Sequence, residues 1–335
     1  EIEDFRFMTT GQYGGIGAVI TKRDEHVYIS EPYEGFAAQK SGLMAGDKIL
    51  EINGTSAKNK STEEVSKILK GQPGTSVSLL IERKSVAEPF NVIFDREKVT
   101  INSVPYSDYI NDDIGYVKLR SFTRGCAEQL KKSIVELSNK KDLKGLILDL
   151  RSNPGGLLNE SVDIANLFID KGELIVSTKG KINSWDKEYI AKKKPIFKNL
   201  PLVVLINNTS ASASEIVSGS IQDLDRGVII GKKSFGKGLV QQTRKLPYNS
   251  ELKLTVAKYY IPSGRCIQAI DYSNRNEDGS VGVIADSLLT EFTTRNGRKV
   301  YDGGGITPDI ITNEEYPVNL IKSLVKERLF FDFAT

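Results

Sequence analysis

A cluster of serines and a later lysine are the residues of this chain best suited to carry out a reaction. Ser210, Ser212 and Ser214 follow an apolar run, and Lys237 stands further along in a Gly-Lys-Gly turn. The chain contains a single histidine, His26, near its beginning. A serine nucleophile needs a base to accept its proton, and a lysine held neutral can serve where no histidine is at hand. The pairing therefore predicts a hydrolase with a serine nucleophile and a lysine base.

The serine cluster also has a purely structural interpretation. Ser212 followed by Glu215 fits a capping box, in which the serine caps a helix and the glutamate reaches back. The catalytic interpretation uses the same geometry, because the first turn of a helix offers unpaired N–H groups and the positive end of the helix dipole to an oxyanion. Local sequence leaves both interpretations open, and it does not decide which of the three serines would be the nucleophile.

The lysine has a competing interpretation as part of a phosphate-binding loop. The spacing from Gly231 to Lys237 matches a P-loop, but Gly238 stands where such a loop needs Ser or Thr to hold magnesium. The residues that follow favour a strand rather than a helix. A base is therefore the favoured role, and it requires burial to lower the lysine pKa from its ordinary value of about 10.4. The apolar neighbours in the sequence are Phe235, Leu239 and Val240.

Two glycine-rich segments can supply backbone N–H groups. Gly155 and Gly156 follow an apolar strand, where an N–H group could add a second donor to an oxyanion hole. The run Gly14–Gly17 lacks the dinucleotide-binding pattern, because Ile20 stands where the third glycine belongs and no strand precedes it. We expect it instead to bind a peptide carboxylate, with the peptide pairing along the edge of a sheet.

Composition excludes several classes of function. The 335 residues carry a net charge of only +3, which gives no sign of nucleic-acid binding. The chain has one histidine and two cysteines, Cys126 and Cys266, which argues against a zinc site, and neither a metal nor an organic cofactor is expected. The same cysteine count excludes a disulfide-dense scaffold, and no apolar run is long enough to span a membrane.

The distribution of expected elements divides the chain in two. From Gly14 to about Phe94 the sequence predicts a β-rich unit with two short helices, one of them Thr62–Leu69 with Ser61 or Thr62 as its cap. From Gly115 onward strands and helices alternate, which is typical of an α/β fold. In that part the expected strands are Gly115–Leu119, Gly145–Leu150, Leu202–Ile206 and Val228–Ile230. The expected helices include Ala127–Leu137, Val162–Phe168 and Ser212–Leu224. A hairpin is expected from Val240–Leu246 and Leu252–Tyr260. The serine cluster falls at the carboxyl end of a strand, where open α/β sheets place their chemistry.

Several motifs together resemble one family. GGIGAVI and GLMAGDKILEING resemble a PDZ domain, while KGLILDLRSNPGG, SASASE, QDLDRGVIIG, SFGKGLVQ, AKYYIPSGRCIQ and GGGITPDI resemble the C-terminal processing (tail-specific) serine proteases. The resemblance implies a crotonase-like α/β (α+β) protease core joined to a smaller β-rich PDZ domain. The expected divisions are an N-terminal segment 1–13, a PDZ domain 14–95, a protease core 96–315 and a C-terminal segment 316–335.

The resemblance also implies roles for individual residues. The catalytic residues would be the nucleophile Ser212, the base Lys237 and Gln241, which would orient the lysine. The oxyanion hole would use the N–H of Ala213 and of a glycine in Gly155-Gly156, and Asp223 would be a supporting residue. In the PDZ domain the carboxylate-binding loop would comprise Gly15, Ile16, Gly17 and Ala18, with the N–H groups of the last three offered to the substrate.

The implied function is a serine endopeptidase that recognises and cleaves unfolded proteins or peptides near their C-termini, the PDZ domain binding the substrate tail. The family also implies a location outside the cytoplasm, in the periplasm or cell envelope, with proximity to a membrane through an N-terminal anchor that this sequence does not contain. A homo-oligomer or a regulatory partner is a further expectation, although the region before Gly14 is short compared with the N-terminal arms of relatives. The main alternative is a catalytically silent peptide receptor on the same fold. A crotonase-like enzyme acting on acyl-thioesters is disfavoured because it would have no use for the PDZ unit.

Overall fold

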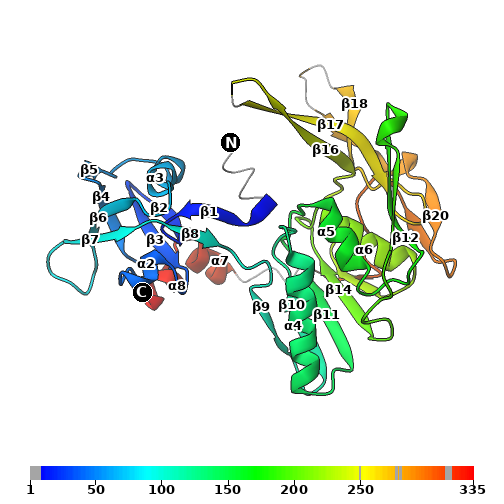
Figure 1. Cartoon of the computed structure of the whole chain (residues 1–335), viewed down its shortest axis with the longest axis horizontal. Coiled ribbons are helices and arrows are strands. Elements are labelled where there is room, and N and C mark those ends of the chain that lie inside the picture. The colour runs from blue at the N-terminus through cyan, green and yellow to red at the C-terminus, as the bar shows by residue number, and fades with distance from the viewer. Residues whose placement is uncertain (1–8, 249, 276–277, 279–280, 314–318) are drawn as a thin grey trace. The chain divides into compact units, whose positions relative to one another are not determined.

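The computed structural model describes residues 9–248, 250–275, 278, 281–313 and 319–335. Contacts divide the chain into two compact units (Figure 1). The smaller unit comprises residues 12–101 and the C-terminal residues after 313, and the larger unit comprises residues 102–313 with the N-terminal residues up to Gly11. Of the expected N-terminal segment, residues 1–8 lie outside the described residues, and so does Asn249 in the turn of the expected hairpin. The units are described one at a time below.

The smaller unit is built on an antiparallel sheet with the strand order β2-β3-β4-β6-β7. Its elements are β2 (Ala18–Arg23), β3 (His26–Pro32), α2 (Ala37–Lys40), β4 (Lys48–Ile52), β5 (Thr55–Ser56), α3 (Thr62–Leu69), β6 (Ser76–Glu82) and β7 (Phe90–Asp95). Alternation along β6 buries Val77, Leu79 and Ile81 in the core of this unit. Ser61 caps α3 in a capping box with Glu64, as the sequence predicts.

Two further parts of the chain belong to the smaller unit. β1 (Gln12–Gly15) pairs with β8 (Glu97–Thr100), so this unit extends past both ends of the expected range 14–95. The C-terminal helices α7 (Asn319–Lys326) and α8 (Leu329–Ala334) join it as well. The Asp332 carboxylate pairs with Arg23 on β2, and Arg328 donates to the hydroxyl of Thr21. The expected C-terminal segment 316–335 is therefore grouped with this unit through the residues that the structure describes.

The larger unit contains a six-stranded sheet with the order β22-β15-β14-β11-β10-β9. Its strands are β9 (Tyr106–Tyr109), β10 (Ile114–Lys118), β11 (Gly145–Asp149), β14 (Leu202–Ile206), β15 (Val228–Gly231) and β22 (Ile310–Ile311). All neighbouring pairs are parallel except β9 with β10. The helices α4 (Cys126–Lys140), α5 (Leu158–Ala165) and α6 (Ala213–Asp223) connect these strands, and the predicted α/β alternation is confirmed.

A second sheet covers the helices of the larger unit. It has the order β13-β12-β17-β16 and consists of β12 (Leu174–Gly180), β13 (Lys187–Ile190), β16 (Leu239–Leu246) and β17 (Ser250–Tyr260). Through β12 it contacts α5 and α6, and its residues Ile175 and Tyr259 share one buried core with the six-stranded sheet (Figure 1). Short ribbons complete the unit: β18 (Ile270–Arg275) with β19 (Val281–Val283), and β20 (Glu291–Thr293) with β21 (Lys299–Tyr301).

One helix ends earlier than the sequence predicts. Val162–Phe168 was expected to be helical, but α5 stops at Ala165. Asn166 follows, and its side chain accepts the N–H groups of Lys192 and Lys193 instead of extending the helix. The next residues turn inward, and Phe168 is fully buried. A tertiary contact, which local periodicity cannot reveal, therefore ends the helix.

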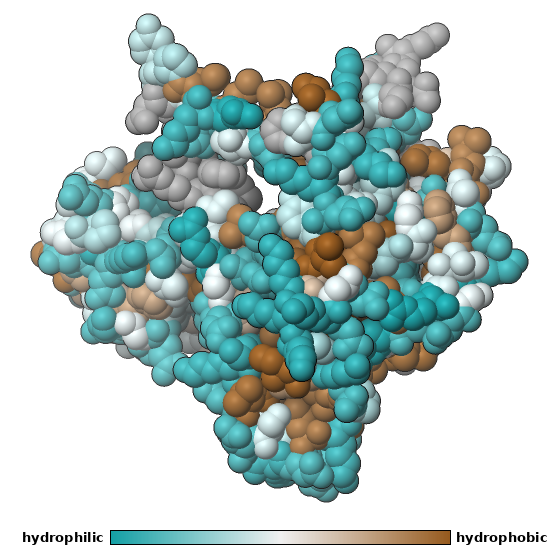
Figure 2. Space-filling view, turned by 45° about the vertical axis from the view of Figure 1, so that its right-hand side comes forward, coloured by the Kyte–Doolittle hydropathy of each residue, from teal (hydrophilic) through white to brown (hydrophobic). Residues whose placement is uncertain are grey.

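The face of the molecule seen in Figure 2 is mostly hydrophilic with scattered apolar patches. A cavity of about 660 Å³ lies where strands β10, β11, β14 and β15 begin, and Ile114, Pro201, Leu202 and Val228 are among its apolar lining residues. This is the edge of the sheet opposite to the one at which the serine cluster follows β14. No helix in the described part of the chain is both long and apolar enough to cross a membrane.

Candidate active site

Ser212 lies in a strained turn between a buried strand and a buried helix. β14 ends at Ile206, and α6 begins at Ala213 with Ser212 as its N-cap. Ser212 has φ 57° and ψ −112°, a conformation that residues other than glycine rarely adopt. Such strain is kept where the surrounding structure imposes it, and it is common at catalytic nucleophiles on strand-to-helix turns. The backbone geometry at Ser212 is therefore typical of a catalytic nucleophile.

The hydroxyl groups of the three candidate serines have different partners. The Ser210 hydroxyl donates to the carbonyl of Leu150 at 2.8 Å, and the Ser214 hydroxyl donates to the carbonyl of Asn153 at 2.9 Å. Both serines are buried. Ser212 is only half-buried, and its side chain makes no cap hydrogen bond. Among the described residues, Ser212 is thus the member of the cluster whose hydroxyl remains available for reaction.

The capping interaction expected at this helix is present in only one direction. Glu215 reaches back and accepts the N–H of Ser212 at 2.7 Å. The N–H of Glu215, however, donates to the carbonyl oxygen of Ser212 and not to its hydroxyl. The structural and the catalytic interpretations therefore do not compete, because the glutamate secures the helix start while the serine side chain stays free.

Lys237 is connected to Ser212 through two buried side chains. Oε2 of Glu215, which accepts the Ser212 N–H, also accepts the N–H of Lys237 at 2.9 Å. The hydroxyl of Tyr259 contacts the carbonyl oxygen of Ser212 at 3.2 Å and that of Lys237. Gln268 adds a third support, because its Oε1 accepts the N–H of Gly238 at 2.8 Å. The loop that carries the lysine is thereby held against the start of α6.

The surroundings of Lys237 favour its neutral form. The residue is half-buried, and burial lowers the pKa of its ammonium group below the ordinary value, with a smaller contribution from the charge of Lys253. The carboxylate of Glu215 acts in the opposite direction. Phe235, expected from the sequence to help bury the lysine, is itself 49 % exposed. The direction of the shift is the one that a lysine base requires.

Backbone N–H groups near Ser212 are available for an oxyanion. Ala213 is the first residue of α6, so its N–H has no partner within the helix. A Cβ on Gly155 would lie 2.8 Å from Cβ of Ser212, so the glycine turn approaches the nucleophile as closely as a backbone can. The N–H of Gly155 donates to Oδ1 of Asn153 at 2.9 Å. Gly156, whose N–H has no hydrogen-bond partner within the described residues, is therefore the better candidate of the two glycines.

Gln241 remains a prediction. It lies on β16 next to a bulge in the pairing with β17, between Val240 and Gln241. Its side chain is exposed. In the part of the chain that the structure describes, no hydrogen bond joins it to Lys237.

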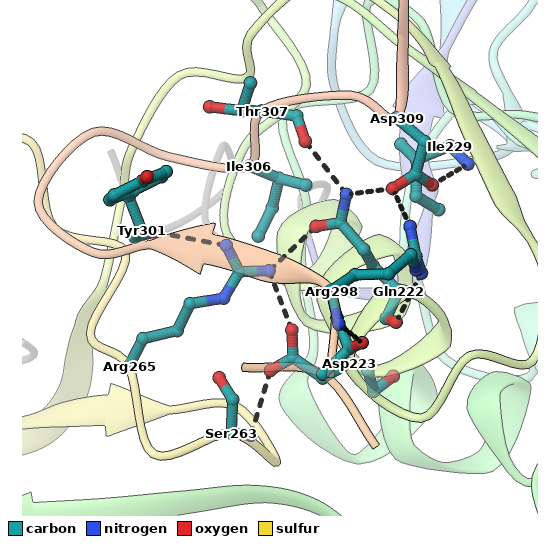
Figure 3. A network of polar contacts seen from close by, with 12 residues as sticks. Gln222, Asp223, Ile229, Ser263, Arg265, Arg298, Tyr301, Ile306, Thr307 and Asp309 are labelled. Atoms are coloured by element: carbon teal, nitrogen blue, oxygen red, sulfur yellow. Dashed lines mark hydrogen bonds and ion pairs between the residues drawn. The ribbon is translucent and has the colours of Figure 1, made fainter. Parts of the chain in front are cut away.

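Asp223 lies at the far end of α6 from the nucleophile. Ten residues of helix separate it from Ala213, which corresponds to about 15 Å. Its carboxylate is fully buried, pairs with the buried guanidinium of Arg265 at 2.8 Å and accepts the N–H of Ser263 at 2.9 Å (Figure 3). The sequence predicted a supporting role for this aspartate, and its position is consistent with support through structure.

The network around Asp223 ties α6 to the segments that follow β17 and β21. Gln222 donates to the carbonyl of Thr307 and to Asp309, while Arg265 also donates to Gln222 (Figure 3). Sequence reasoning missed this network and missed Tyr259 and Gln268, since their partners are far away in the sequence. Glu215 was noticed only as a cap. The motif AKYYIPSGRCIQ, which contains Tyr259 and Gln268, was the available signal.

In the smaller unit, the expected carboxylate-binding loop links β1 to β2. Ile16 is buried, and its carbonyl accepts the N–H of Ala38. Gly17 has φ 74°, and a Cβ there would come within 2.4 Å of Cβ of Phe36. Within the described residues, the N–H groups of Ile16 and Gly17 donate to no acceptor. Ala18 begins β2, the edge strand of the sheet, and Gly15 ends β1.

Among the residues that the structure describes, His, Cys, Asp and Glu side chains form no group of three that could hold an ion. Cys126 and Cys266 are both free thiols.

Comparison with protein families identifies two parts of the chain. Residues 113–274 match the model of peptidase family S41, and residues 5–82 match that of the PDZ domain. The chain belongs to peptidase family S41. The S41 match covers β10 to β18 and includes Ser212 and Lys237, and the PDZ match includes the loop before β2. The predicted family and the predicted fold, a mixed α/β protease core with a β-rich PDZ domain, are both confirmed.

Individual S41 relatives are similar over most of this chain. A carboxy-terminal-processing protease of Bartonella bacilliformis is 39 % identical over 271 residues, which are 80 % of this chain and 62 % of the relative. A probable CtpA-like serine protease of Staphylococcus aureus is 36 % identical over 271 residues, again 80 % of this chain but 53 % of the relative. The chain thus spans between about half and three fifths of the length of these curated relatives.

A solved S41 structure shares the fold. The crystal structure of a putative S41 protease from Bacteroides fragilis covers 98 % of this chain and 84 % of its own, with a TM-score of 0.54 and 17 % sequence identity. At that identity the similarity concerns the fold alone. The alignment covers nearly the whole of this chain.

Proposed function

We propose that this S41 chain is a serine endopeptidase with Ser-Lys catalysis that cleaves proteins or peptides near their C-termini. The observation that carries the proposal is the position of Ser212. Its backbone is strained, its hydroxyl is free while those of Ser210 and Ser214 are engaged, and its amide shares one carboxylate oxygen with Lys237. The similarity to a carboxy-terminal-processing protease supports the same activity.

Catalysis would begin with neutral Lys237. Nζ accepts the proton of the Ser212 hydroxyl while Oγ forms a bond to the substrate carbonyl carbon, and the N–H groups of Ala213 and Gly156 stabilise the oxyanion. The lysine then returns the proton to the leaving amine as the peptide C–N bond breaks. Water attacks the acyl-enzyme, with Lys237 accepting its proton, and breakage of the Oγ–C bond releases the acid and restores the serine. Gln241 would orient Lys237 once substrate is bound.

The PDZ domain would bind the substrate tail. The unengaged N–H groups of Ile16 and Gly17 suit a C-terminal carboxylate, and β2 is an edge strand to which an extended peptide can add. Helix α3 contacts β2 and would form the other wall of the groove. Unfolded protein or peptide C-termini are therefore the proposed partners. Nucleic acid is not proposed as a partner, because the net charge of the chain is only +3.

The cellular setting follows only from the family. We place the enzyme outside the cytoplasm, in the periplasm or cell envelope, near a membrane if the full protein carries an N-terminal anchor. We also propose, on the same basis, that the protein forms a homo-oligomer or binds a regulatory partner. Fractionation of cells that express the full-length protein tests the location, and recovery in the cytoplasmic fraction would contradict it.

The test of the activity compares the wild-type protein with Ser212→Ala and Lys237→Arg, using β-casein as an unfolded substrate. We expect cleavage by the wild type alone, because an arginine stays charged and cannot accept the serine proton. Equal proteolysis by all three proteins would refute the assignment. An absence of cleavage by the wild type, together with binding of peptides that have a free C-terminus, would favour the alternative of a silent PDZ receptor.

Tail recognition has its own test. Two peptides of one sequence, one with a free and one with an amidated C-terminus, are compared as substrates. We expect amidation to raise KM, because it removes the charge that the N–H groups of Ile16 and Gly17 would bind. Equal kcat/KM for the two peptides would refute carboxylate recognition while leaving the endopeptidase activity in place.

A further inference from the structure

Glu215 has more interactions than a helix cap requires. It is fully buried in the first turn of α6, where a capping glutamate needs only the N–H of the N-cap residue. Its carboxylate instead accepts four hydrogen bonds. The donors are the N–H of Ser212 at 2.7 Å, the hydroxyl of Ser234 at 2.6 Å, the N–H of Gly236 at 2.6 Å and the N–H of Lys237 at 2.9 Å. Three of the four lie on the loop of the lysine base.

The four bonds are divided evenly between the two oxygens. Oε1 accepts from Ser234 and Gly236, and Oε2 accepts from Ser212 and Lys237. Only a carboxylate can accept at both ends. A glutamine would turn its amide NH2 group toward two donors, and a protonated acid would turn its O–H toward at least one. The site is therefore built for the ionised form of Glu215, although burial raises the pKa of this carboxyl and the donors offset that only in part.

We infer that Glu215 is a positioning residue, which holds the backbone of the nucleophile Ser212 and of the base Lys237 in register through one shared oxygen. The inference rests on the proposed Ser-Lys mechanism. Loop 234–237 has other supports, because the N–H of Ala269 donates to the carbonyl of Gly236 and the N–H of Phe235 donates to the carbonyl of Ser210, but neither bond reaches Ser212 or Lys237 itself. Among the described residues, Glu215 is the side chain that bonds to the amides of both catalytic residues.

The charge of Glu215 also acts on the chemistry of Lys237. The carboxylate favours the ammonium form, while burial and Lys253 on β17 favour the neutral form. The phenol of Tyr259, which is fully buried with its pKa raised far above the ordinary value, stays neutral and adds no charge. Because the reaction needs neutral Lys237, kcat/KM rises with pH through the pKa of this lysine. Removing the negative charge of Glu215 should lower that pKa and move the rise to lower pH.

The test measures kcat and the pH profile of kcat/KM for Glu215→Gln with a fluorogenic peptide that has a free C-terminus. We expect kcat to fall by roughly 10²-fold, since two donors lose their acceptor and the reacting groups shift. We also expect the acidic limb of kcat/KM to move to lower pH, which a merely structural residue would not cause. Glu128→Gln, an exposed glutamate in the first turn of α4, is the matched control and should change neither quantity.

Two results would overturn the inference. One is a folded Glu215→Gln protein with wild-type kcat, and the other is a lowered kcat with an unmoved acidic limb. Should Glu215→Gln fail to fold, Glu215→Asp decides: it keeps the charge but shortens the arm, so kcat should fall while the limb stays in place, and an unchanged kcat would exclude the positioning role. Failure of the proposed function is recognised separately, because wild type and Ser212→Ala would then behave alike.

Discussion

The N–H groups of Ser212 and Lys237 donate to one atom, Oε2 of Glu215. The two residues belong to different elements, the N-terminus of α6 and the loop before β16, so their alignment depends on tertiary contacts. Tyr259 makes a second connection between the same two residues, through their carbonyl oxygens. The Ser-Lys pair is therefore held by its backbone from both sides, while its side chains remain free to react.

The first prediction concerns the charge on β17. Lys253 lowers the pKa of Lys237, so Lys253→Gln should raise that pKa and move the acidic limb of kcat/KM to higher pH. This direction is opposite to that expected for Glu215→Gln. The side chain is exposed, so the shift should shrink as salt is added. Lys245→Gln on the same hairpin is the control, and identical pH profiles for the two variants would contradict the electrostatic account.

The second prediction separates stability from alignment. Tyr259→Phe removes the hydroxyl that contacts the carbonyls of Ser212 and Lys237, and Tyr109→Phe removes one that contacts the carbonyls of Leu137 and Lys141 at 2.9 and 3.0 Å. Both variants should lose about 1 kcal/mol of unfolding free energy in a urea titration.

Only Tyr259→Phe should also lower kcat, because only that hydroxyl contacts the Ser-Lys pair. An equal effect of the two substitutions on kcat, after correction for the folded fraction, would mean that Tyr259 contributes stability alone.

The third prediction tests how closely the glycine turn approaches the nucleophile. In Gly155→Ala the new Cβ would lie 2.6 Å from the carbonyl oxygen of Ala211 and 2.8 Å from Cβ of Ser212. We expect kcat to fall by roughly 10²-fold as the nucleophile turn is displaced. Gly172→Ala is a matched control, since Gly172 has φ 95° against 98° at Gly155 but no atom within 4 Å of its Cβ position. The control should share the backbone strain and keep its activity.

The local signals in the sequence were sufficient for much of the fold. The bounds of α3 are those predicted, because its cap and its apolar spacing are complete within a few residues. The helices α7 and α8 were not predicted. A local signal was present in α7, where Leu320, Ile321, Leu324 and Val325 recur at helical spacing, but side chains such as Leu320 are largely exposed and not buried in a core.

The site was predictable to the extent that its residues are chemically distinctive. Ser212 and Lys237 could be selected by their types, their spacing and the family resemblance. The sequence could not show that the hydroxyls of Ser210 and Ser214 are engaged, because their acceptors, the carbonyls of Leu150 and Asn153, lie about sixty residues earlier in the chain. The four partners of Glu215 and the pairing of Asp223 with Arg265 depend on segments brought together by the fold. No periodicity or local motif encodes such contacts.

The last prediction concerns Asp223, whose loss should act through stability. Asp223→Asn leaves the Arg265 guanidinium, 1 % exposed, without its ionic partner, and breaking a buried pair in this way costs about 3–5 kcal/mol. The double variant Asp223→Leu, Arg265→Met removes both charges and should recover part of this loss. Recovery should be incomplete, because the N–H of Ser263 and Oε1 of Gln222 also lose their partners.

Thermal unfolding and kcat at saturating substrate, measured on the folded fraction, check this prediction. Because about 15 Å of helix separates Asp223 from Ser212, the folded single variant should keep most of the wild-type kcat and an unmoved acidic limb. The double variant should be more active than the single one at temperatures where the single one partly unfolds. A fully folded Asp223→Asn protein with wild-type stability and a much lower kcat would instead mean that the aspartate acts on the reaction itself.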